Sequence, residues 1–432
     1  MPIPPIDAEP GSSPAREPLP PREPSPVPEP LPVPEPLPAR EPARGPALTR
    51  ARGALAAEAR AAAARASGVR LVPVRWSALP GWEDDDHAAA LAALRRTARH
   101  VLAKGPHRTG ALGPAGADQI DALHASLAAG DPRAFFEARY RPHRVEGEAL
   151  GGPDGRGFVT GFYEPTIAAS PTRDAEHRHA IHAPPPALAK ADEHDGRVAA
   201  DLPEGHAWGL LGADGRLHEA PDRGAIERGA LAGDAAFADW PVIAWARDRV
   251  DLFFAHVQGA ARLAMPDGTV RRITYAAKSG HPFTGIGGVL AGRGALAPEA
   301  VTMASIRAWL AANPGEVDAL LRLNRSYIFF REAPVDDPAL GPVAAARVPL
   351  TPGRSLAVDR LLHTFGTPVH VHAPTLRIDG APFARLMVAQ ETGTAIVGAA
   401  RGDIFTGSGD EAGARAGSIR HEARFTLLVP RR

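Results

Sequence analysis

The chain has 432 residues, which is enough for two domains or for one domain with a long tail. Its 49 basic and 49 acidic residues give a formal net charge of zero, so the composition does not favour nucleic acid as a partner. The absence of cysteine excludes disulfides, thiolate metal sites, a cysteine nucleophile and a lipidated N-terminal cysteine. No apolar run approaches the roughly 20 residues that a membrane-spanning helix requires.

The first segment, residues 1–46, alternates proline with glutamate, leucine, valine and arginine. Because proline removes backbone donors and fixes φ, this segment is predicted to be an extended, disordered tail. It has no basic start followed by an apolar stretch, so we do not expect a signal peptide. Residues 47–68 are rich in alanine and arginine and are predicted to form a helical linker.

Three helices are expected next. The first begins at Asp84-Asp85-Asp86-His87, because acidic side chains satisfy free N–H groups and complement the helix dipole. A metal site at these residues is the alternative, although adjacent residues rarely converge on one ion. The other two helices are predicted at about 117–127 and 132–140.

Strands are expected at 69–74 and at 157–165. The second ends in a turn where Tyr163 and Glu164 could line a groove. The alternation in His177–His182 predicts a strand with solvated imidazoles, and a metal site is the alternative.

Residues 242–287 are predicted to be rich in β-structure, including the run Val250–Phe254, and Pro266-Asp267-Gly268 indicates a hairpin turn. Further elements are expected along the rest of the chain: helices at 298–311 and 314–323, a strand at 324–330, and short strands with Gly/Pro turns, as in a small barrel, over 342–432.

One carboxylate, Asp403, stands in a glycine-rich segment directly before Ile404 and Phe405. A carboxyl group at the edge of an apolar surface is poorly solvated as an anion, so its pKa rises toward the range in which it can donate a proton. The neighbouring glycines would allow an extended polymer to approach closely. The simpler interpretation is an aspartate in a turn between two strands.

Several segments are similar, in the same order, to those of one family. They are Thr160–Pro165; Val250–Phe254 with Val257–Gly259; Tyr275-Ala276 with Gly280–Phe283 and Ile286-Gly287; Asn324–Phe330; Ser355 with Asp359-Arg360; and Asp403–Phe405 with Gly407–Gly409 and Glu411–Gly413. Through these segments the chain, from about residue 69 to 430, resembles the MltA family of lytic murein transglycosylases, which cleave bacterial peptidoglycan.

The resemblance implies a mainly β fold with helices (α+β). A double-psi β-barrel domain would be built from residues 69–166 and 338–432, with a second β-domain inserted at 167–337 and a groove between the two. The implied partner is the glycan strand of peptidoglycan, bound by a monomer without cofactor or metal. The substrate places the protein in the periplasm or cell envelope, although neither a signal peptide nor a lipid-attachment cysteine is present.

In the family, the catalytic acid falls on the position of Asp403. The other recurring acids fall on Asp359, as a supporting residue, and on Glu391, where the family usually has aspartate. The resemblance further implies that one carboxyl group suffices, because the nucleophile is the 6-hydroxyl of N-acetylmuramic acid itself. Asp403 would protonate the leaving oxygen and then accept the hydroxyl proton as a 1,6-anhydro ring closes.

The other matched residues are expected to bind substrate through their polar groups or rings, and for all of them except Glu164 and Glu391 a packing or strand-pairing role is the alternative. They are Thr160, Tyr163, Glu164, Gln258, Tyr275, Lys278 and Glu391. Two alternatives remain for the whole protein. One is an inactive cell-wall glycan-binding module on the same scaffold. The other is a glycosidase that uses water, with Asp359 or Glu391 as the base.

Overall fold

The computed structural model describes residues 59–431, except 192–199, 204–205, 233–234 and 379. The predicted tail at 1–46 therefore lies outside the described residues, as does most of the predicted linker at 47–68. Residues 59–66 of that linker are helical.

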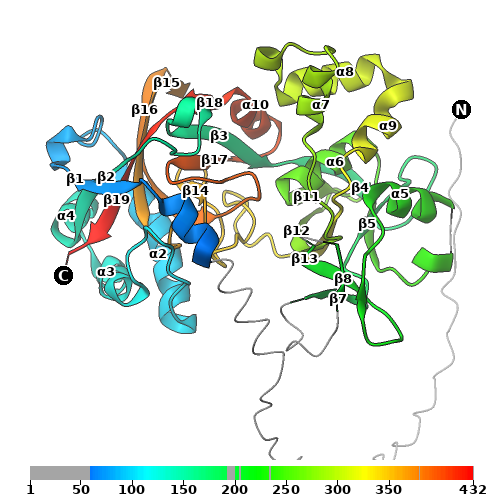
Figure 1. The fold of residues 1–432 in the computed structure, drawn as a ribbon, viewed down its shortest axis with the longest axis horizontal. Coiled ribbons are helices and arrows are strands. Elements are labelled where there is room, and N and C mark those ends of the chain that lie inside the picture. Colours follow the sequence, from blue (N-terminus) through cyan, green and yellow to red (C-terminus); the bar gives the residue numbers. More distant parts are fainter. Residues whose placement is uncertain (1–58, 192–199, 204–205, 233–234, 379, 432) are drawn as a thin grey trace, which may run out of the picture. The chain divides into compact units, whose positions relative to one another are not determined.

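The largest sheet has nine strands in the order β1-β2-β19-β15-β16-β14-β17-β3-β18. Strands from both ends of the folded chain lie side by side in it, since β2 pairs with β19 and β3 pairs with β17 (Figure 1). The bounds are β1 (Arg70–Pro73), β2 (Tyr140–Glu146), β3 (Phe158–Glu164), β14 (Ser355–Val358), β15 (Pro368–Ile378), β16 (Ala381–Glu391), β17 (Arg401–Ser408), β18 (Arg420–Glu422) and β19 (Arg424–Pro430).

Two smaller sheets are formed by the chain between β3 and β14. The six-stranded sheet has the order β13-β12-β11-β4-β10-β5, and the four-stranded sheet has the order β6-β8-β9-β7. Their bounds are β4 (Thr166–Ser170), β5 (His179–His182), β6 (Leu188–Lys190), β7 (Ala200–Asp201), β8 (Trp208–Leu211), β9 (Leu217–His218), β10 (Val242–Ala246), β11 (Ala260–Ala264), β12 (Val270–Lys278) and β13 (Ile328–Ala333). The predicted hairpin turn is confirmed between β11 and β12, where the N–H of Met265 donates to the carbonyl of Thr269 at 3.0 Å.

The helices agree with the sequence in the first third of the chain and differ near its end. Their bounds are α2 (His87–Lys104), α3 (Gly116–Ala128), α4 (Pro132–Arg139), α5 (Arg223–Ala232), α6 (Arg249–Gln258), α7 (Ile286–Gly292), α8 (Met303–Ala312), α9 (Val317–Arg322) and α10 (Asp410–Ser418). Short 3₁₀ turns are η1 (Trp76–Ala78), η2 (Pro153–Gly155), η3 (Ala235–Phe237), η4 (Pro298–Ala300) and η5 (Pro314–Glu316). The sequence analysis predicted only strands and turns over 342–432, and it therefore missed helix α10.

The acidic start of α2 is confirmed in part. Asp86 caps the helix, because its Oδ1 accepts a hydrogen bond from the N–H of Ala89 at 3.0 Å. Asp85 has a different role: its carboxylate is 2.8 Å from Nη2 of Arg354 and accepts from the N–H of Leu386 at 2.6 Å. Asp85 therefore joins the start of α2 to the nine-stranded sheet.

The segment Val250–Phe254, predicted as β-structure, lies in α6 instead. Asp248 caps the first turn, accepting hydrogen bonds from the N–H groups of Val250 and Asp251 at 2.7 and 2.9 Å. Gly259, with a φ of 76°, ends the helix. The prediction was wrong because the period of a short apolar run does not distinguish a strand from a buried helix, whereas the caps do.

The second half of strand β16, residues 386–390, is buried on both faces, and its alternation separates two apolar clusters. Leu386 and Val388 belong to a cluster with residues of α2, α3 and α4. Met387 and Ala389 point to the opposite face and belong to the cluster at the centre of the nine-stranded sheet. The fold is thus mixed α and β with β-structure predominant, as predicted. Among the helices of the described residues, none has both the length and the apolar character needed to span a bilayer.

Candidate active site

Asp403 lies in the middle of β17, and not in a turn between strands. It pairs with Thr160 on the parallel strand β3. A Cβ added at the preceding Gly402 would be 2.9 Å from side-chain atoms of Leu356 and Phe425. The space beside this glycine is therefore filled by the core, and the approach of a polymer is not the reason for it.

The half-buried carboxyl group of Asp403 has a hydroxyl as its neighbour. Thr160 Oγ1 donates to Asp403 Oδ1 at 2.6 Å, and Arg401 Nη2 donates to Thr160 Oγ1 at 2.8 Å. Burial raises the pKa of Asp403 to about 6, although the hydrogen bond from Thr160 and the charge of Arg401 oppose the rise. The carboxyl group is therefore near the point at which it can both donate and accept a proton at neutral pH.

Arg401 is a candidate that the sequence prediction did not include. Its Nη1 also donates to the carbonyl of Gly402, and its guanidinium lies 5.8 Å from the ring centroid of Phe158. The two contacts orient the guanidinium toward the hydroxyl that contacts Asp403. The sequence did contain a signal for Arg401. It lies two residues before Asp403, and residues i and i+2 of a strand point to the same face of the sheet.

Glu391 ends β16 in the same row of the sheet as Asp403. Ala357 of β14 pairs with both residues, so the two acids flank it from adjacent strands, with their backbones roughly 10 Å apart. The carboxylate of Glu391 accepts from the N–H groups of Thr392 and Ala345 at 2.7 and 3.1 Å. Burial raises its pKa to about 7 in spite of these bonds.

Asp359, predicted as a supporting acid, directly follows β14 and is 2% exposed. Arg65 Nη1 is 3.0 to 3.1 Å from its two carboxylate oxygens. The N–H groups of Leu361 and Gly398 also donate to it, each at 3.0 Å. These contacts hold neighbouring loops in place, and a part in catalysis stays a prediction.

Glu164, at the end of β3, is fully buried. Arg272 Nε and Arg262 Nε contact its two carboxylate oxygens at 2.6 and 2.9 Å, and Ser408 Oγ donates to it at 2.7 Å. Both arginines belong to the six-stranded sheet, so this carboxylate joins that sheet to the nine-stranded one. Contact with substrate stays a prediction, and the geometry gives Glu164 the joining role.

Tyr163 and Gln258 lie together. The backbone N–H of Tyr163 donates to Gln258 Oε1 at 3.2 Å. The tyrosine ring is 6% exposed and packs on α10, where a Cβ added at Gly413 would be 2.7 Å from it. The packing alternative therefore has direct support for Tyr163, and substrate contact stays a prediction for both residues.

Tyr275 and Lys278 both belong to β12, opposite Phe330 and Ile328 of β13. Tyr275 is 41% exposed, so its ring is accessible to a ligand. Lys278 is half-buried, and burial lowers its pKa. Their predicted contacts with a glycan remain predictions.

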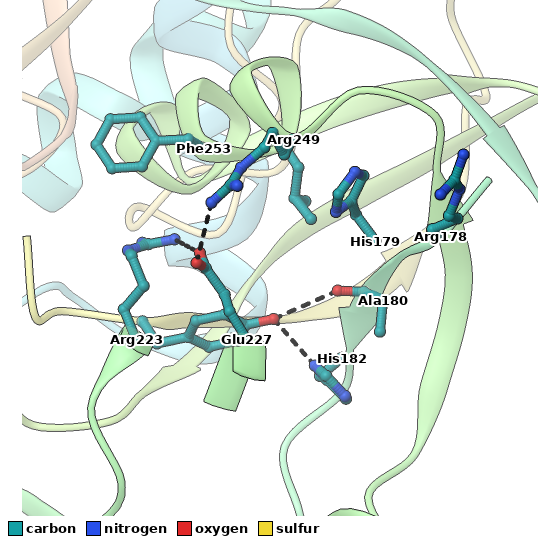
Figure 2. Close-up of a pocket in the computed structure, with 10 residues that line it drawn as sticks. Arg178, His179, Ala180, His182, Arg223, Glu227, Arg249 and Phe253 are labelled. Atoms are coloured by element: carbon teal, nitrogen blue, oxygen red, sulfur yellow. Dashed lines mark hydrogen bonds and ion pairs between the residues drawn. The ribbon is translucent and has the colours of Figure 1, made fainter. Parts of the chain in front are cut away.

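A small pocket with several charged side chains in its lining lies elsewhere, beside the six-stranded sheet (Figure 2). Arg223 Nη1 and Arg249 Nη2 approach the carboxylate of Glu227 at 3.2 and 3.5 Å. The cavity volume is about 30 Å³, which is room for a water molecule or two and not for a sugar. Asp403 does not line this pocket.

The predicted strand of solvated imidazoles at His177–His182 is only partly correct. Strand β5 covers His179–His182, but His182 is 2% exposed, and its Nδ1 is 2.9 Å from the hydroxyl of Tyr327. Burial lowers the pKa of His182 to about 4. This imidazole is therefore a neutral part of the core, because the sheet covers the face on which it lies.

The fold and the site define a mixed α+β protein that presents a half-buried carboxyl group, with a pKa near neutrality, on a strand of its largest sheet. Such a group is suited to general acid–base chemistry. Comparison with known proteins specifies this class. Residues 158–331 match the MltA specific insert domain, and residues 354–429 match the 3D domain.

The chain is 32% identical over 297 residues to membrane-bound lytic murein transglycosylase A of Escherichia coli K12, covering 67% of this chain and 70% of that protein. The crystal structure of a membrane-bound lytic murein transglycosylase from Agrobacterium tumefaciens is 48% identical, with a TM-score of 0.75, over 83% of this chain and 97% of that chain. The structure of Escherichia coli MltA with bound chitohexaose is 26% identical, with a TM-score of 0.57, over 84% and 92% of the two chains. The chain belongs to the MltA family of lytic murein transglycosylases, as its motifs predicted.

Proposed function

We propose that this protein cleaves the β-1,4 bond between N-acetylmuramic acid and N-acetylglucosamine in peptidoglycan, without water, and leaves 1,6-anhydro-N-acetylmuramic acid ends. The observation that carries the proposal is the half-buried carboxyl group of Asp403, whose pKa burial raises to about 6. Membership of the family supports the reaction and the substrate. The chitohexaose bound to the Escherichia coli relative supports a glycan ligand.

In this mechanism Asp403 acts first as an acid. It donates its proton to the glycosidic oxygen while the bond from C1 to that oxygen breaks, and the N-acetylglucosamine end leaves as an alcohol. The carboxylate then accepts the proton of the 6-hydroxyl while that oxygen bonds to C1. Asp403 ends protonated, ready for another cycle. Because the attack occurs within one sugar, its effective molarity is high and no water needs to be activated.

Thr160 and Arg401 influence the pKa of Asp403. Thr160 accepts a hydrogen bond from Arg401, so its own hydroxyl hydrogen is directed at Asp403 Oδ1. That bond stabilises the carboxylate formed after the first proton transfer. It also limits how far burial raises the pKa, which suits a group that first donates and then accepts.

The other predicted residues bind or support the glycan in this proposal. The exposed ring of Tyr275 contacts a sugar face, and the ammonium of Lys278 meets a lactyl or peptide carboxylate. Glu391, with a pKa of about 7, is protonated in a large fraction of molecules at neutral pH and donates a hydrogen bond to a sugar hydroxyl. Gln258 offers its amide, and Asp359 supports the end of β14.

We also propose the finer architecture and the location. Residues 69–166 and 338–432 form a double-psi β-barrel domain, residues 167–337 form the inserted β-domain, and the glycan lies in a groove between them. The protein acts as a monomer without a cofactor. The relatives are described as membrane-bound, and together with the substrate this supports the periplasm or cell envelope as the place of action.

Mass spectrometry of muropeptides released from purified sacculi tests the proposal. The wild-type protein should give anhydro products, whereas hydrolysis would give products about 18 Da heavier and a binding module would give none. Asp403→Asn should reduce the rate roughly 10²- to 10⁴-fold with an unchanged circular dichroism spectrum. The control is Asp410→Asn, which changes an exposed acid in the first turn of α10 and should keep full activity. Wild-type turnover by Asp403→Asn would reject the assignment.

A further inference from the structure

Three potential metal ligands converge outside the site of Asp403. His206 precedes β8, Glu219 follows β9, and His281 lies in the loop after β12. Glu219 Oε1 is 3.4 Å from His281 Nδ1 and 3.8 Å from His206 Nε2, and one ligand atom from each residue lies within 4.8 Å of the others. The cluster brings His281 together with two residues that precede it by 62 and 75 positions, Glu219 and His206.

These separations fit one ion. Zinc binds histidine nitrogen and carboxylate oxygen at about 2.0 to 2.2 Å, and a tetrahedral arrangement then places neighbouring ligand atoms about 3.3 to 3.5 Å apart. The distance of 3.4 Å between Glu219 and His281 equals such an edge, and the distance of 3.8 Å to His206 exceeds it by a few tenths of an ångström. The two histidine nitrogens lie within 4.8 Å of each other, and side-chain rotations would complete the coordination.

Hydrogen bonding accounts for only one of the four ring nitrogens of His206 and His281. Within the described part of the chain, both ring nitrogens of His206 and Nδ1 of His281 are buried without a hydrogen-bond partner. His281 as a whole is only 2% exposed. Buried polar atoms in folded proteins nearly always have a partner, so the two nitrogens that approach Glu219, Nε2 of His206 and Nδ1 of His281, indicate a missing ligand.

The tautomer of His281 is fixed in the form that a metal needs. Its Nε2 is 2.7 Å from the carbonyl oxygen of Ala220. Since a carbonyl only accepts, Nε2 carries a proton, and in the neutral imidazole the lone pair of Nδ1 then points toward Glu219. A backbone carbonyl on the other ring nitrogen is the usual way in which proteins orient a ligating histidine.

The loop after β12 is held close to β8. Gly280 has a φ of 93°, and a Cβ at this position would be 2.6 Å from the carbonyl oxygen of Trp208 and 3.3 Å from the ring of His206. Only glycine adopts this conformation readily in so little space. The loop therefore keeps the two imidazoles together, with ring centroids 5.2 Å apart.

One cation competes for the carboxylate. Arg325 Nη2 is 3.5 Å from Glu219 Oε1, while its Nε is 3.1 Å from Asp222. The side chains of Arg325 and Glu219 are 50% and 41% exposed, so this contact is weak and the arginine can remain on Asp222. The exposure of Glu219 also leaves room for a water molecule as a fourth ligand.

We propose that His206, Glu219 and His281 bind a zinc-class divalent cation and that this ion fastens the four-stranded sheet to the loop after β12. The ion would have two nitrogen ligands, one carboxylate and one water. It differs from the sequence prediction, which expected no metal. Its role is structural, so it stands apart from the acid chemistry of Asp403.

The test uses the full-length chain, freed of metal with a chelator and then titrated with Zn²⁺ or with Co²⁺ as a visible-absorption probe. We expect one equivalent to bind, with the intense d–d bands of a tetrahedral Co²⁺ site, and Zn²⁺ to raise the Tm. Glu219→Gln and His281→Gln should each lose more affinity than the roughly 10- to 100-fold that loss of an outer partner costs. Arg325→Gln should bind more tightly, because the competing charge is gone.

His218→Gln is the matched control. His218 Nε2 forms a comparable contact with Asp214, at 3.0 Å, but lies outside the cluster, so this variant should bind metal like the wild type. Binding that is equally strong in Glu219→Gln and His281→Gln would mean an adventitious ion only and would overturn the proposal. Less than half an equivalent bound by the wild type, in a chain shown to be folded by circular dichroism, would overturn it as well.

Discussion

Glu164 and Asp403 are carboxylates on neighbouring strands of one sheet, and they differ in the charges that surround them. Glu164 is fully buried and contacts two arginines of the six-stranded sheet at 2.6 to 3.1 Å. Asp403 is half-buried and accepts a hydrogen bond from the hydroxyl of Thr160. The guanidinium of Arg401 does not contact Asp403 in this chain of hydrogen bonds but donates to the hydroxyl of Thr160.

The difference shows how one fold gives two acids opposite roles. A buried carboxylate with two guanidinium partners ties elements together. A desolvated carboxylate with a hydroxyl as its direct partner binds a proton more readily, and burial raises the pKa of Asp403 to about 6. Of these two acids, Glu164 should therefore contribute more to the stability of the fold, and Asp403 should contribute more to catalysis.

The largest expected effect on stability comes from Glu164→Gln. Removing this charge leaves Arg262 and Arg272 without their carboxylate, and breaking a buried pair typically costs about 3 to 5 kcal/mol. Urea unfolding followed by circular dichroism measures the loss. Glu422→Gln removes an exposed partner of Arg156 and should leave the midpoint unchanged. An equal loss in both variants would contradict the joining role of Glu164.

Asp403→Asn should change the stability in the opposite direction and make the folded protein more stable at neutral pH. The pKa of Asp403 is about 6 in the folded protein, above its ordinary value of 3.8, so between these values the folded state binds more protons than the unfolded state. Stability therefore falls as the pH rises from about 4 to about 6, and Asp403→Asn removes this fall. The variant should be roughly 1 to 3 kcal/mol more stable than the wild type at pH 7.

Unfolding curves at pH 4, 5, 6 and 7 provide the measurement for Asp403→Asn. Asp410→Asn serves as the control and should follow the wild-type dependence. A parallel pH dependence in Asp403→Asn and the wild type would show that the carboxyl group is not desolvated as the structure indicates.

Thr160→Val tests whether the hydroxyl beside Asp403 lowers the pKa of that carboxyl group. The variant keeps the shape of the side chain and removes a hydrogen bond that lowers the pKa of Asp403. A hydrogen bond to a charged group is worth about 1.5 kcal/mol, so the pKa should rise by roughly one unit. In a pH–rate profile, the limb on which activity declines with rising pH is expected near pH 6 for the wild type and should move upward in the variant. An unchanged limb would show that Thr160 does not set the pKa of Asp403.

Glu391→Gln should have the smallest effect. Gln keeps a donor group at the position, and the proposed role is a single hydrogen bond to substrate. We expect KM to rise roughly two- to tenfold with kcat nearly unchanged. Steady-state kinetics on soluble glycan fragments measure both. A fall in kcat as large as that of Asp403→Asn would instead give Glu391 a direct part in the reaction.

Local sequence was sufficient for several elements. Proline at the start and an arginine in the last turn mark α4, and the residues after Met265 mark the hairpin between β11 and β12. The apolar residues after Asp403 indicated a carboxyl group with a raised pKa, which agrees with its burial in the fold, whereas its catalytic role came from the family resemblance and stays a prediction. The same approach was wrong for Val250–Phe254, because the caps at Asp248 and Gly259 outweigh the β-propensity of an apolar run.

The sequence by itself determined which side chains are chemically able to act, together with the turns and caps that depend on neighbours along the chain. Only the tertiary structure decided how deeply each of these side chains is buried and which charged groups lie beside it. Thr160 and Asp403 are 243 residues apart, and the arginines of Glu164 lie 98 and 108 residues away from it. Proton affinity depends on burial and on charges a few ångströms away, and only the folded chain creates those distances.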